Sequence, residues 1–590
     1  MQSYSAPLND MKFIIEDFLN SGAADTLFKQ NDIEIEDFNF ILDESSKFCE
    51  EILLPLNQSG DKEGCTYDNG KVKTPKGFKD AYKQFVESGW QGAALEQKYG
   101  GQGLPYIFNV FFDEMITSSN MGFGNYPGLT GNAFEAIKKS ASDDLKDLYL
   151  PKLATGEWSG TMNLTEPQCG TDLGLSKAMA NPQEDGSYKL TGTKIFITGG
   201  EQDLSKNIIH LVLARTPNAP KGIKGISLFL VPKIIPNKDG SLGEENSLSC
   251  GSIEDKMGIK SSSTCVMHYN DAKAWLVGDL NKGMKAMFIM MNGARLFVGI
   301  QGIGLSETAY QSSLHYAKER VQGKLPDSEN IADPILVHPE IRKNLMFMKS
   351  VNDGIRGLML KAGNAFDLID SDQSKDEVQS SENLIALLTP ILKSFATDKA
   401  LEITNNALQI YGGHGYITDH GMEQLVRDAR ITPIYEGTNG IQALDLIGRK
   451  FNIHEGQIIN QYVDEIKKFI TENNDHQNMK KYIELFQPSF LDLKDCISYI
   501  KKIDKNNIKE INAHAMDFLN LFALVAVGYT WLQFIKISRE KVTQQEDDFY
   551  ISKIQLGEFF LTKVIFETKK FKNNIYSSGN LYNNFADNYF

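Results

Sequence analysis

Apolar residues in the first quarter of the chain recur at the spacing of helices with one buried face. Stripes at residues 13–19 and 38–42 are separated by acidic positions, which is the period of an amphipathic helix. Glycine-rich segments at residues 98–103 and 122–131 predict loops between helices. We therefore expect a helical domain over residues 1–157.

The pattern changes near Gly156. Short runs rich in Val, Ile, Thr and Phe, separated by Gly, Asn and Pro, extend from there to about residue 277, as is typical of strands joined by turns. A polar insertion at residues 236–247 predicts a surface hairpin. We expect a compact β domain over residues 158–280. Its predicted strands are residues 189–198, 208–214, 226–231 and 265–269.

Helical periodicity returns at Gly283. Residues 294–320 form one long helical pattern, and residues 384–395 carry apolar side chains at spacings of four, three and four. The acidic stretch at residues 370–382 predicts a solvated linker. We expect a helical bundle over residues 281–452, followed by an extra helical domain over residues 453–590 that ends in an aromatic, Asn-rich tail.

The fold class expected from this order is mainly α with a central β domain. A doubly wound α/β fold alternates strands with helices over a long span. Here the strands fall in one block between helical regions, so the sequence argues against a doubly wound plan.

One apolar segment, residues 516–535, is long enough to cross a bilayer. It also carries Asp517, Asn520 and Gln533, which are costly to place in lipid. A buried helix of a bundle explains the same composition, so we expect a core helix, with a peripheral membrane contact as the alternative.

Charge and cysteine content narrow the class of protein. The formal net charge of −15 argues against nucleic-acid binding, which requires a basic footprint. The six cysteines form no C-x-x-C pair, which fits free thiols in a reducing compartment. We expect no metal site. The first twenty residues lack a basic region followed by an apolar core, so we expect a cytoplasmic protein without a secretory signal.

Candidate chemistry centres on residues 431–442, ITPIYEGTNGIQ. Glu436 is flanked by Tyr435 and Gly437, and glycine allows a ligand to approach the backbone closely. A carboxylate on such a loop is partly desolvated, which makes it a stronger base toward a bound substrate. The alternative is an ordinary turn with an exposed glutamate.

Three further motifs carry candidate binding groups. Residues 162–174, MNLTEPQCGTDLG, offer hydroxyls and bare backbone amides suited to ring carbonyls and a pyrophosphate. Residues 194–200, KIFITGG, place Phe196 and Thr198 on one face of a strand, where they suit a flat heteroaromatic ring. Residues 409–415, QIYGGHG, expose amides at a helix end. The glycine run at residues 299–304 follows no strand, so we reject a dinucleotide-binding fingerprint.

In this order the motifs resemble those of the acyl-CoA dehydrogenase family. The first is similar to T-E-P-x-x-G-[ST]-D, the second to K-x-[WF]-I-T-[NG] and the third to Q-[VI]-[FY]-G-G-x-G; Arg427, Asp428 and Ala429 followed by IYEGT complete the pattern. The resemblance spans about residues 80–450. The N-terminal segment and the extension after residue 455 resemble a longer bacterial subgroup that includes 3-methylmercaptopropionyl-CoA dehydrogenases and some fatty acyl-CoA dehydrogenases.

The resemblance implies an N-terminal helical domain, a small β-barrel-like domain and a C-terminal four-helix bundle, with the extra helical domain appended. It implies FAD as cofactor, with the Thr198 hydroxyl near flavin N5. Arg320 and residues 409–413 are implied at the adenine-side half of FAD, of the neighbouring subunit. The implied cofactor-binding residues are Met162, Leu164, Thr165, Gly170, Thr171, Phe196, Ile197, Thr198, Arg320, Gln409, Gly412, Gly413 and Thr438. The implied substrate-binding residues are Thr171, Asn292, Arg295, Glu436 and Gly437.

Glu436 is the implied catalytic base, which takes the α-proton of an acyl-CoA thioester. Some family members carry the base on a helix, directly before an arginine matched here by Arg295. Ala294 stands at that position, so no carboxylate competes. Two departures affect the adenine side: R-x-x-F-G becomes Arg320 to Gly323 without phenylalanine, and the usual His-Gln pair is His338-Pro339.

The resemblance also implies electron-transfer flavoprotein as electron acceptor and a homodimer or dimer of dimers. An acyl-CoA oxidase that uses oxygen has the same base and stays as an alternative. A DNA-binding flavoprotein of the same fold is a further alternative, which should carry a basic extension. Residues 451–590 contain 17 Lys+Arg and 18 Asp+Glu, which offers no phosphate-binding surface.

Overall fold

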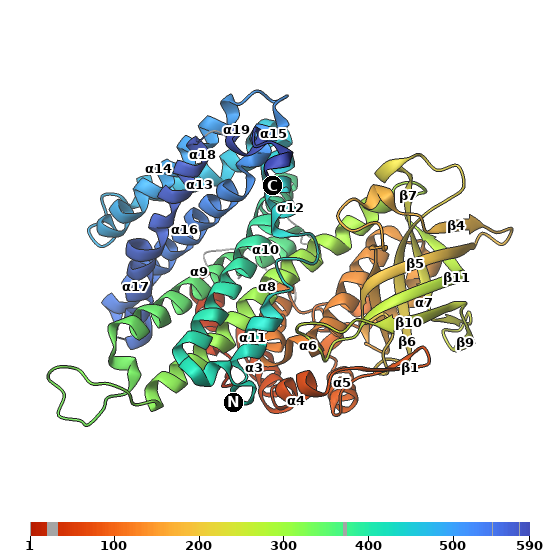
Figure 1. Ribbon diagram of the computed structural model, residues 1–590, viewed down its shortest axis with the longest axis horizontal. Coiled ribbons are helices and arrows are strands. Elements are labelled where there is room, and N and C mark those ends of the chain that lie inside the picture. The colour runs from red at the N-terminus through yellow and green to blue at the C-terminus, as the bar shows by residue number, and fades with distance from the viewer. Residues whose placement is uncertain (1, 20–32, 370–373, 546, 578) are drawn as a thin grey trace. The chain divides into compact units, whose positions relative to one another are not determined.

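The computed structural model of the protein describes residues 2–19, 33–369, 374–545, 547–577 and 579–590. The chain divides into two compact units (Figure 1). One contains residues 44–297 and the other residues 1–43 and 298–590.

The helical part of the first unit precedes its sheet. Its long helix α6 (Tyr106–Ser140) is kinked at Asn120, where φ is −161° and ψ is 87°. A short hairpin of β1 (Thr66–Asp68) and β2 (Lys71–Lys73) lies between two of the helices. The other α-helices of this part are α4 (Pro55–Glu63), α5 (Phe78–Glu87) and α7 (Asp143–Ala154).

The loop predicted at residues 122–131 is wrong, because this segment belongs to helix α6. Its glycines serve close packing instead of turning the chain. A Cβ at Gly122 would lie 2.0 Å from Ser261 Oγ, and one at Gly128 would lie 2.5 Å from the Phe297 ring. The sequence shows the glycines but not the neighbours that require them.

The strands of the first unit close on one another. Pairing runs β4–β5–β11–β7–β6 and returns from β6 to β4, while β10 extends from β11 and β3 from β6. Inside this barrel lies an apolar cluster that includes Leu190, Ile197 and Phe229. The strands are β3 (Trp158–Asn163), β4 (Met179–Pro182), β5 (Tyr188–Thr198), β6 (Asn207–Arg215), β7 (Ile226–Pro232), β10 (Leu248–Ile253) and β11 (Thr264–Val277).

The predicted strands and the surface hairpin are confirmed. The hairpin pairs β8 (Ile234–Pro236) with β9 (Leu242–Glu245) and is separate from the barrel. The glycine run at residues 299–304 lies within helix α8 (Gly283–Glu319), which agrees with the rejection of a dinucleotide fingerprint.

Helices α9 (Pro339–Ile369) and α10 (Lys375–Tyr411) pack against each other in the second unit. The linker predicted at residues 370–382 is wrong from residue 374 onward, and residues 370–373 lie outside the described part. Ser374 and Glu377 form a capping box that starts α10, so the polar residues are its solvated first turns. The short helices α11 (Met422–Ala429) and α12 (Asn439–Leu444) follow.

The C-terminal helices surround α16 (Ala515–Gln544), the expected core helix (Figure 1). Gly354 and Gly357 of α9 let it approach closely, since a Cβ at Gly354 would lie 2.6 Å from Val527. The Trp531 indole donates to the Ser350 carbonyl at 2.9 Å. Around it are α13 (Gln457–Asn473), α14 (Lys480–Lys502), α15 (Ile508–Ala513), α17 (Asp548–Phe559), α18 (Thr568–Tyr576) and α19 (Asn580–Asn583).

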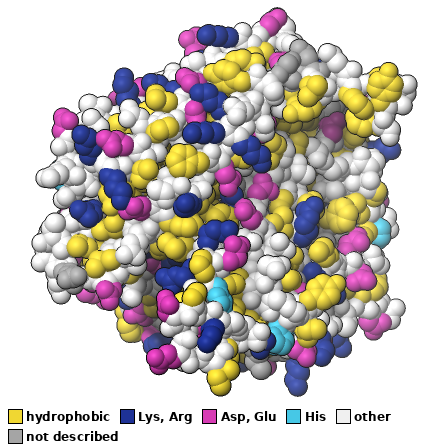
Figure 2. Space-filling model, turned by 60° about the vertical axis from the view of Figure 1, so that its left-hand side comes forward, with side chains coloured by type: hydrophobic (Ala, Val, Ile, Leu, Met, Phe, Trp, Pro, Cys, Tyr) yellow, Lys and Arg dark blue, Asp and Glu magenta, His cyan; other side chains and the backbone are white. Residues whose placement is uncertain are grey.

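Helices α8 and α16 are long and apolar enough to cross a membrane. Their most apolar windows are 78% and 89% buried inside the protein, as in core helices of soluble proteins. On the face shown in Figure 2, basic and acidic side chains are interspersed, so this face offers no basic footprint for nucleic acid.

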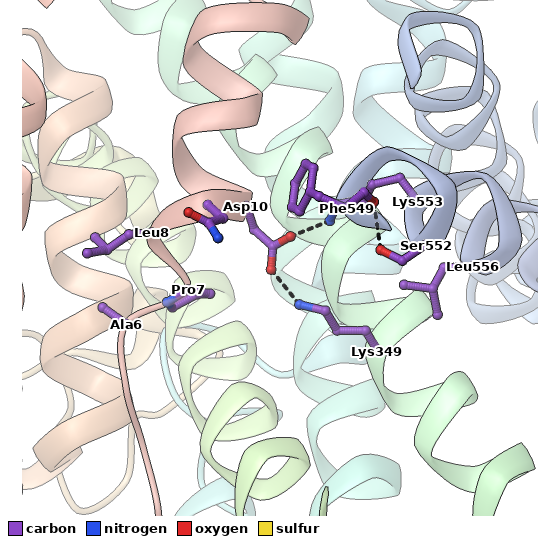
Figure 3. A pocket seen from close by; sticks show the side chains of 10 residues that line it. Ala6, Pro7, Leu8, Asp10, Lys349, Phe549, Ser552, Lys553 and Leu556 are labelled. Carbon is purple, nitrogen blue, oxygen red and sulfur yellow. Dashed lines mark hydrogen bonds and ion pairs between the residues drawn. The ribbon is translucent and has the colours of Figure 1, made fainter. Parts of the chain in front are cut away.

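The N-terminal segment is tied into the second unit by buried ion pairs (Figure 3). Asp10 of α1 (Leu8–Phe13) lies between Lys349 of α9 and Lys553 of α17, at 2.5 Å from each ammonium nitrogen. Both lysines also pair with Asp353. A cavity of about 360 Å³ adjoins this network. Because each charge meets an opposite one, we interpret the network as a structural junction.

Candidate active site

Glu436 lies on the loop between α11 and α12 in a left-handed conformation. Its φ is 57°, and the next residue, Gly437, has φ 90°. A residue with a Cβ pays about 1–3 kcal/mol for such a conformation, and outliers of this kind cluster at functional sites. The side chain is half-buried. The loop therefore has the strained backbone and partial desolvation expected of a positioned base.

The residues on either side of Glu436 are anchored within the same unit. The Tyr435 hydroxyl donates to the side-chain oxygen of the fully buried Gln301 on α8. Burial raises the pKa of Tyr435 well above its ordinary value, so this hydroxyl stays a donor. Thr438 caps α12 by accepting from the Ile441 amide at 3.3 Å. The loop is thus fixed from both ends.

In the first unit, a buried ion pair joins the loop of residues 164–166, after strand β3, to strand β5. Lys194 Nζ lies 2.8 Å from Glu166 Oε1, and the two side chains are 0% and 3% exposed. The ammonium also donates to the Leu164 carbonyl at 2.9 Å, and the Ile195 amide donates to Thr165 at 2.9 Å. The structure therefore brings Leu164 and Thr165 beside Lys194 and Ile195.

Phe196 stands on a β-bulge of strand β5. Its φ is 60°, and the register with β11 shifts between Cys265 and Met267. A bulge re-aims side chains: Phe196 is 59% exposed while Ile197 is 2% exposed. Thr198 is half-buried. The Phe196 ring therefore faces outward from the barrel, and Thr198 follows two residues later on the same strand.

Gly170 and Thr171 are exposed on the segment after strand β3. Nothing lies within 4 Å of a Cβ built on Gly170. The backbone there is open to a ligand.

Two helices of the second unit end near the predicted adenine-side residues. Arg320 directly follows α8, and Gln409, Gly412 and Gly413 lie within two residues of the end of α10. The rings of Tyr316 on α8 and Tyr411 on α10 stack at 4.1 Å. Nothing lies within 4 Å of a Cβ on either glycine, so this surface is also open. The ends of the two helices therefore lie side by side, and the role of these residues on the adenine side stays a prediction.

Asn292 and Arg295 lie on the part of α8 that belongs to the first unit. Arg295 is 5% exposed. A Cβ at Gly293 would lie 2.0 Å from Asn132 Oδ1 of α6, so this glycine lets the two helices pack closely. Ala294 is 1% exposed.

Several polar residues around the loops were not identified from the sequence. They are Glu166, Gln301, Lys393, Asn439 and Gln442, each buried. The sequence marks such a residue only as a polar residue inside an apolar run, as in TPILKSFAT around Lys393. Such a signal cannot tell which loop the side chain meets.

Four domain descriptions match consecutive parts of the chain. "Acyl-CoA dehydrogenase, N-terminal domain" matches residues 36–157, and the middle domain of the same name matches residues 161–272. "Acyl-CoA dehydrogenase, C-terminal domain" matches residues 281–451, and "Acetyl-CoA dehydrogenase C-terminal like" matches residues 462–582.

Known proteins show the same relationship. The 3-methylmercaptopropionyl-CoA dehydrogenase of Ruegeria pomeroyi is 44% identical over 467 residues, 79% of each chain. An acyl-CoA dehydrogenase of Bacillus anthracis, solved in complex with FAD, shares the fold with a TM-score of 0.72 over 92% of this chain and 87% of its own, at 21% identity. A structure described as electron transferring flavoprotein of Acidaminococcus fermentans has a TM-score of 0.58 and 27% identity, over 70% of this chain and 97% of its own.

These matches confirm the expected fold class: mainly α, with a central β domain and further helices at the C-terminus. They span nearly all of the chain that the motifs covered, and the extension besides. The chain belongs to the acyl-CoA dehydrogenase family and is an oxidoreductase of that family.

Proposed function

We propose that this enzyme dehydrogenates an acyl-CoA thioester between its α and β carbons, with Glu436 as the catalytic base and FAD as cofactor. The observation that carries the proposal is the conformation of Glu436, held at φ 57° on a loop anchored at both ends. An ordinary exposed turn has no need of a strained carboxylate-bearing residue with a buried anchor on each side.

The residues of the chain fit FAD. The outward-facing Phe196 ring and Thr198 hydroxyl suit the flat ring system, with Met162, Leu164, Thr165 and Ile197 beside them. The open backbone at Gly170 and Thr171 suits a pyrophosphate. The chemistry that FAD supplies when bound is acceptance of the β-hydrogen together with its electron pair. Thr438, next to the base, is proposed as a further contact.

In the reaction Glu436 removes the α-proton, and the electron pair left on the α-carbon forms the double bond as the β-hydrogen departs with its own pair. Negative charge develops on the thioester oxygen during this step. The backbone N–H of Glu436 is the proposed donor to that oxygen, since a positioned donor stabilises a developing oxyanion. Gly437 leaves room for the thioester, and Thr171, Asn292 and Arg295 are the proposed substrate contacts.

Arg320, Gln409, Gly412 and Gly413 are proposed to hold the adenine-side half of FAD bound to a neighbouring subunit. This assigns the enzyme to a homodimer or a dimer of dimers. The open surface at both glycines supports a backbone approach by an anion.

The proposed substrate is a fatty acyl-CoA or 3-methylthiopropanoyl-CoA. Support comes from the Ruegeria pomeroyi relative, whose name specifies the 3-methylmercaptopropionyl thioester. The proposed electron acceptor is electron-transfer flavoprotein, and the proposed location is the cytoplasm.

Anaerobic mixing of the purified enzyme with a panel of acyl-CoAs tests the proposal. The panel contains 3-methylthiopropanoyl-CoA and straight-chain thioesters of increasing length, and the readout is bleaching of the yellow FAD absorbance. We expect bleaching by at least one of these thioesters; if no thioester bleaches the flavin, the proposed function is refuted. Slow reoxidation in air with rapid reoxidation by electron-transfer flavoprotein is expected, and the reverse would identify an oxidase.

A further inference from the structure

Lys393 is a fully buried cation in the helical bundle, directly behind the loop that carries Glu436. It lies on α10 and is 0% exposed. Its ammonium donates to the Gly437 carbonyl at 2.9 Å and to the Asn439 side-chain oxygen at 2.9 Å. A buried ammonium is costly unless its protons meet acceptors. Here one acceptor is the residue after Glu436, and the other is the first residue of α12.

Asn439 extends the same contact to the next turn of α10. Its side-chain amide donates to the Ser394 carbonyl at 3.1 Å and to Asp398 Oδ1 at 2.7 Å. Its backbone amide donates to the Pro433 carbonyl at 3.0 Å. One stretch of α10 therefore holds the loop directly after Glu436, and the Asn439 backbone ties that point to Pro433, before Glu436.

The hydrogen bond from Lys393 reaches the strained part of the loop backbone. Glu436 and Gly437 are consecutive left-handed residues, so the direction of their carbonyls determines how the loop presents the Glu436 side chain. Gln442 donates to both carbonyls, at 3.3 and 3.1 Å, and Lys393 adds the charge-assisted bond to Gly437. Hydrogen bonds from an ionised donor are about twice as strong as neutral ones.

We propose that Lys393 is the positioning residue of the base: its buried ammonium, bonded to the Gly437 carbonyl and the Asn439 amide oxygen, holds the left-handed turn in which Glu436 meets the α-proton. The inference rests on the proposed function of Glu436. Lys393 itself touches no reacting atom. Its loss therefore slows proton removal while leaving ligand binding in place.

The test compares Lys393→Met with the wild-type holoenzyme. Methionine keeps the apolar stem of the side chain and removes the ammonium. We expect the limiting rate of anaerobic FAD bleaching to fall about 10²-fold, the effect of a reacting group misplaced by about 1 Å. The dissociation constant of the 2-enoyl-CoA product, measured from its perturbation of the FAD spectrum, should change by less than about twofold, which separates chemistry from binding.

Lys399→Met is the matched control. Lys399 lies on the same helix, is 8% exposed, and pairs with Glu402 and Glu567, so its bleaching rate should match the wild type. An equal loss in both variants would show a general effect of removing a buried lysine and would overturn the proposal. A wild-type rate in Lys393→Met would also overturn it.

Glu436→Gln, measured in parallel, separates this inference from the function on which it rests. If Glu436→Gln bleaches at the wild-type rate, the base assignment itself fails. If it loses bleaching while Lys393→Met retains it, only the positioning role fails. Should Lys393→Met not fold, Lys393→Gln carries the same test; failure of both to retain FAD would make Lys393 a general structural residue and refute its specific role.

Discussion

Lys194 and Glu166 form a buried ion pair, with 2.8 Å between Nζ and Oε1. The pair joins strand β5 to the loop that follows strand β3. Burial alone would raise the pKa of Glu166, but the Lys194 charge and hydrogen bonds from Ser176 and Lys177 lower it to about 2. The pair fixes the two segments proposed to face the FAD ring.

We expect Lys194→Met to destabilise the protein and weaken FAD retention. Removing one partner of a buried pair leaves an uncompensated charge, which costs about 3–5 kcal/mol. Chemical denaturation and FAD content after gel filtration measure the two effects. Lys189→Met, exposed on the same strand, is the control and should change neither. Undiminished stability and FAD content in Lys194→Met would contradict the proposed role of the pair.

We expect the stability of the protein to depend on pH through the buried His210. Burial lowers its pKa to about 3, with a smaller contribution from the Lys233 charge; its Nδ1 lies 2.7 Å from the Thr161 hydroxyl. The unfolded chain takes up the proton below about pH 6.5, whereas the folded protein does not. This contribution to stability is therefore complete above pH 6.5 and is lost as pH falls toward 3.

Each pH unit below that point should remove up to about 1.4 kcal/mol of unfolding free energy through His210. Urea unfolding at pH 7.5, 6.0 and 5.0 should show a shallower decline in His210→Gln than in the wild type. His268→Gln, on the exposed side of β11, serves as the surface control. Parallel declines in the wild type and His210→Gln would exclude His210 as the source.

Gly437→Ala should impair the base loop, because alanine disfavours the φ of 90° found there. We expect slower FAD bleaching, with about 1–3 kcal/mol of strain opposing the left-handed turn. Gly440→Ala is the matched control three residues away, since its Cβ would meet Thr438 Oγ1 at an ordinary 3.8 Å. Equal rates in the two variants would show that the loop tolerates a side chain at position 437.

The sequence predicted local elements better than the packing that supports them. Strand β5 and the hairpin after β7 follow from β-rich runs and turn residues, which are local signals, whereas the bulge at Phe196 was not predicted. The helical glycines of α6 and the capped start of α10 were misread as a loop and a linker, because their roles depend on neighbours distant in the chain. The sequence did not identify Lys393 for the same reason, because its partners Gly437 and Asn439 lie more than forty residues away in the chain.

The most direct test of Glu436 as the catalytic base compares FAD bleaching by a reactive acyl-CoA in Glu436→Gln and in the wild type. The rates are measured under anaerobic single-turnover conditions. If Glu436 is the base, the variant retains FAD and binds the 2-enoyl-CoA product. Its FAD bleaching slows by about 10²–10⁴-fold, which is the contribution of a positioned general base. Bleaching of Glu436→Gln at a rate close to that of the wild type would contradict this role and place the base elsewhere.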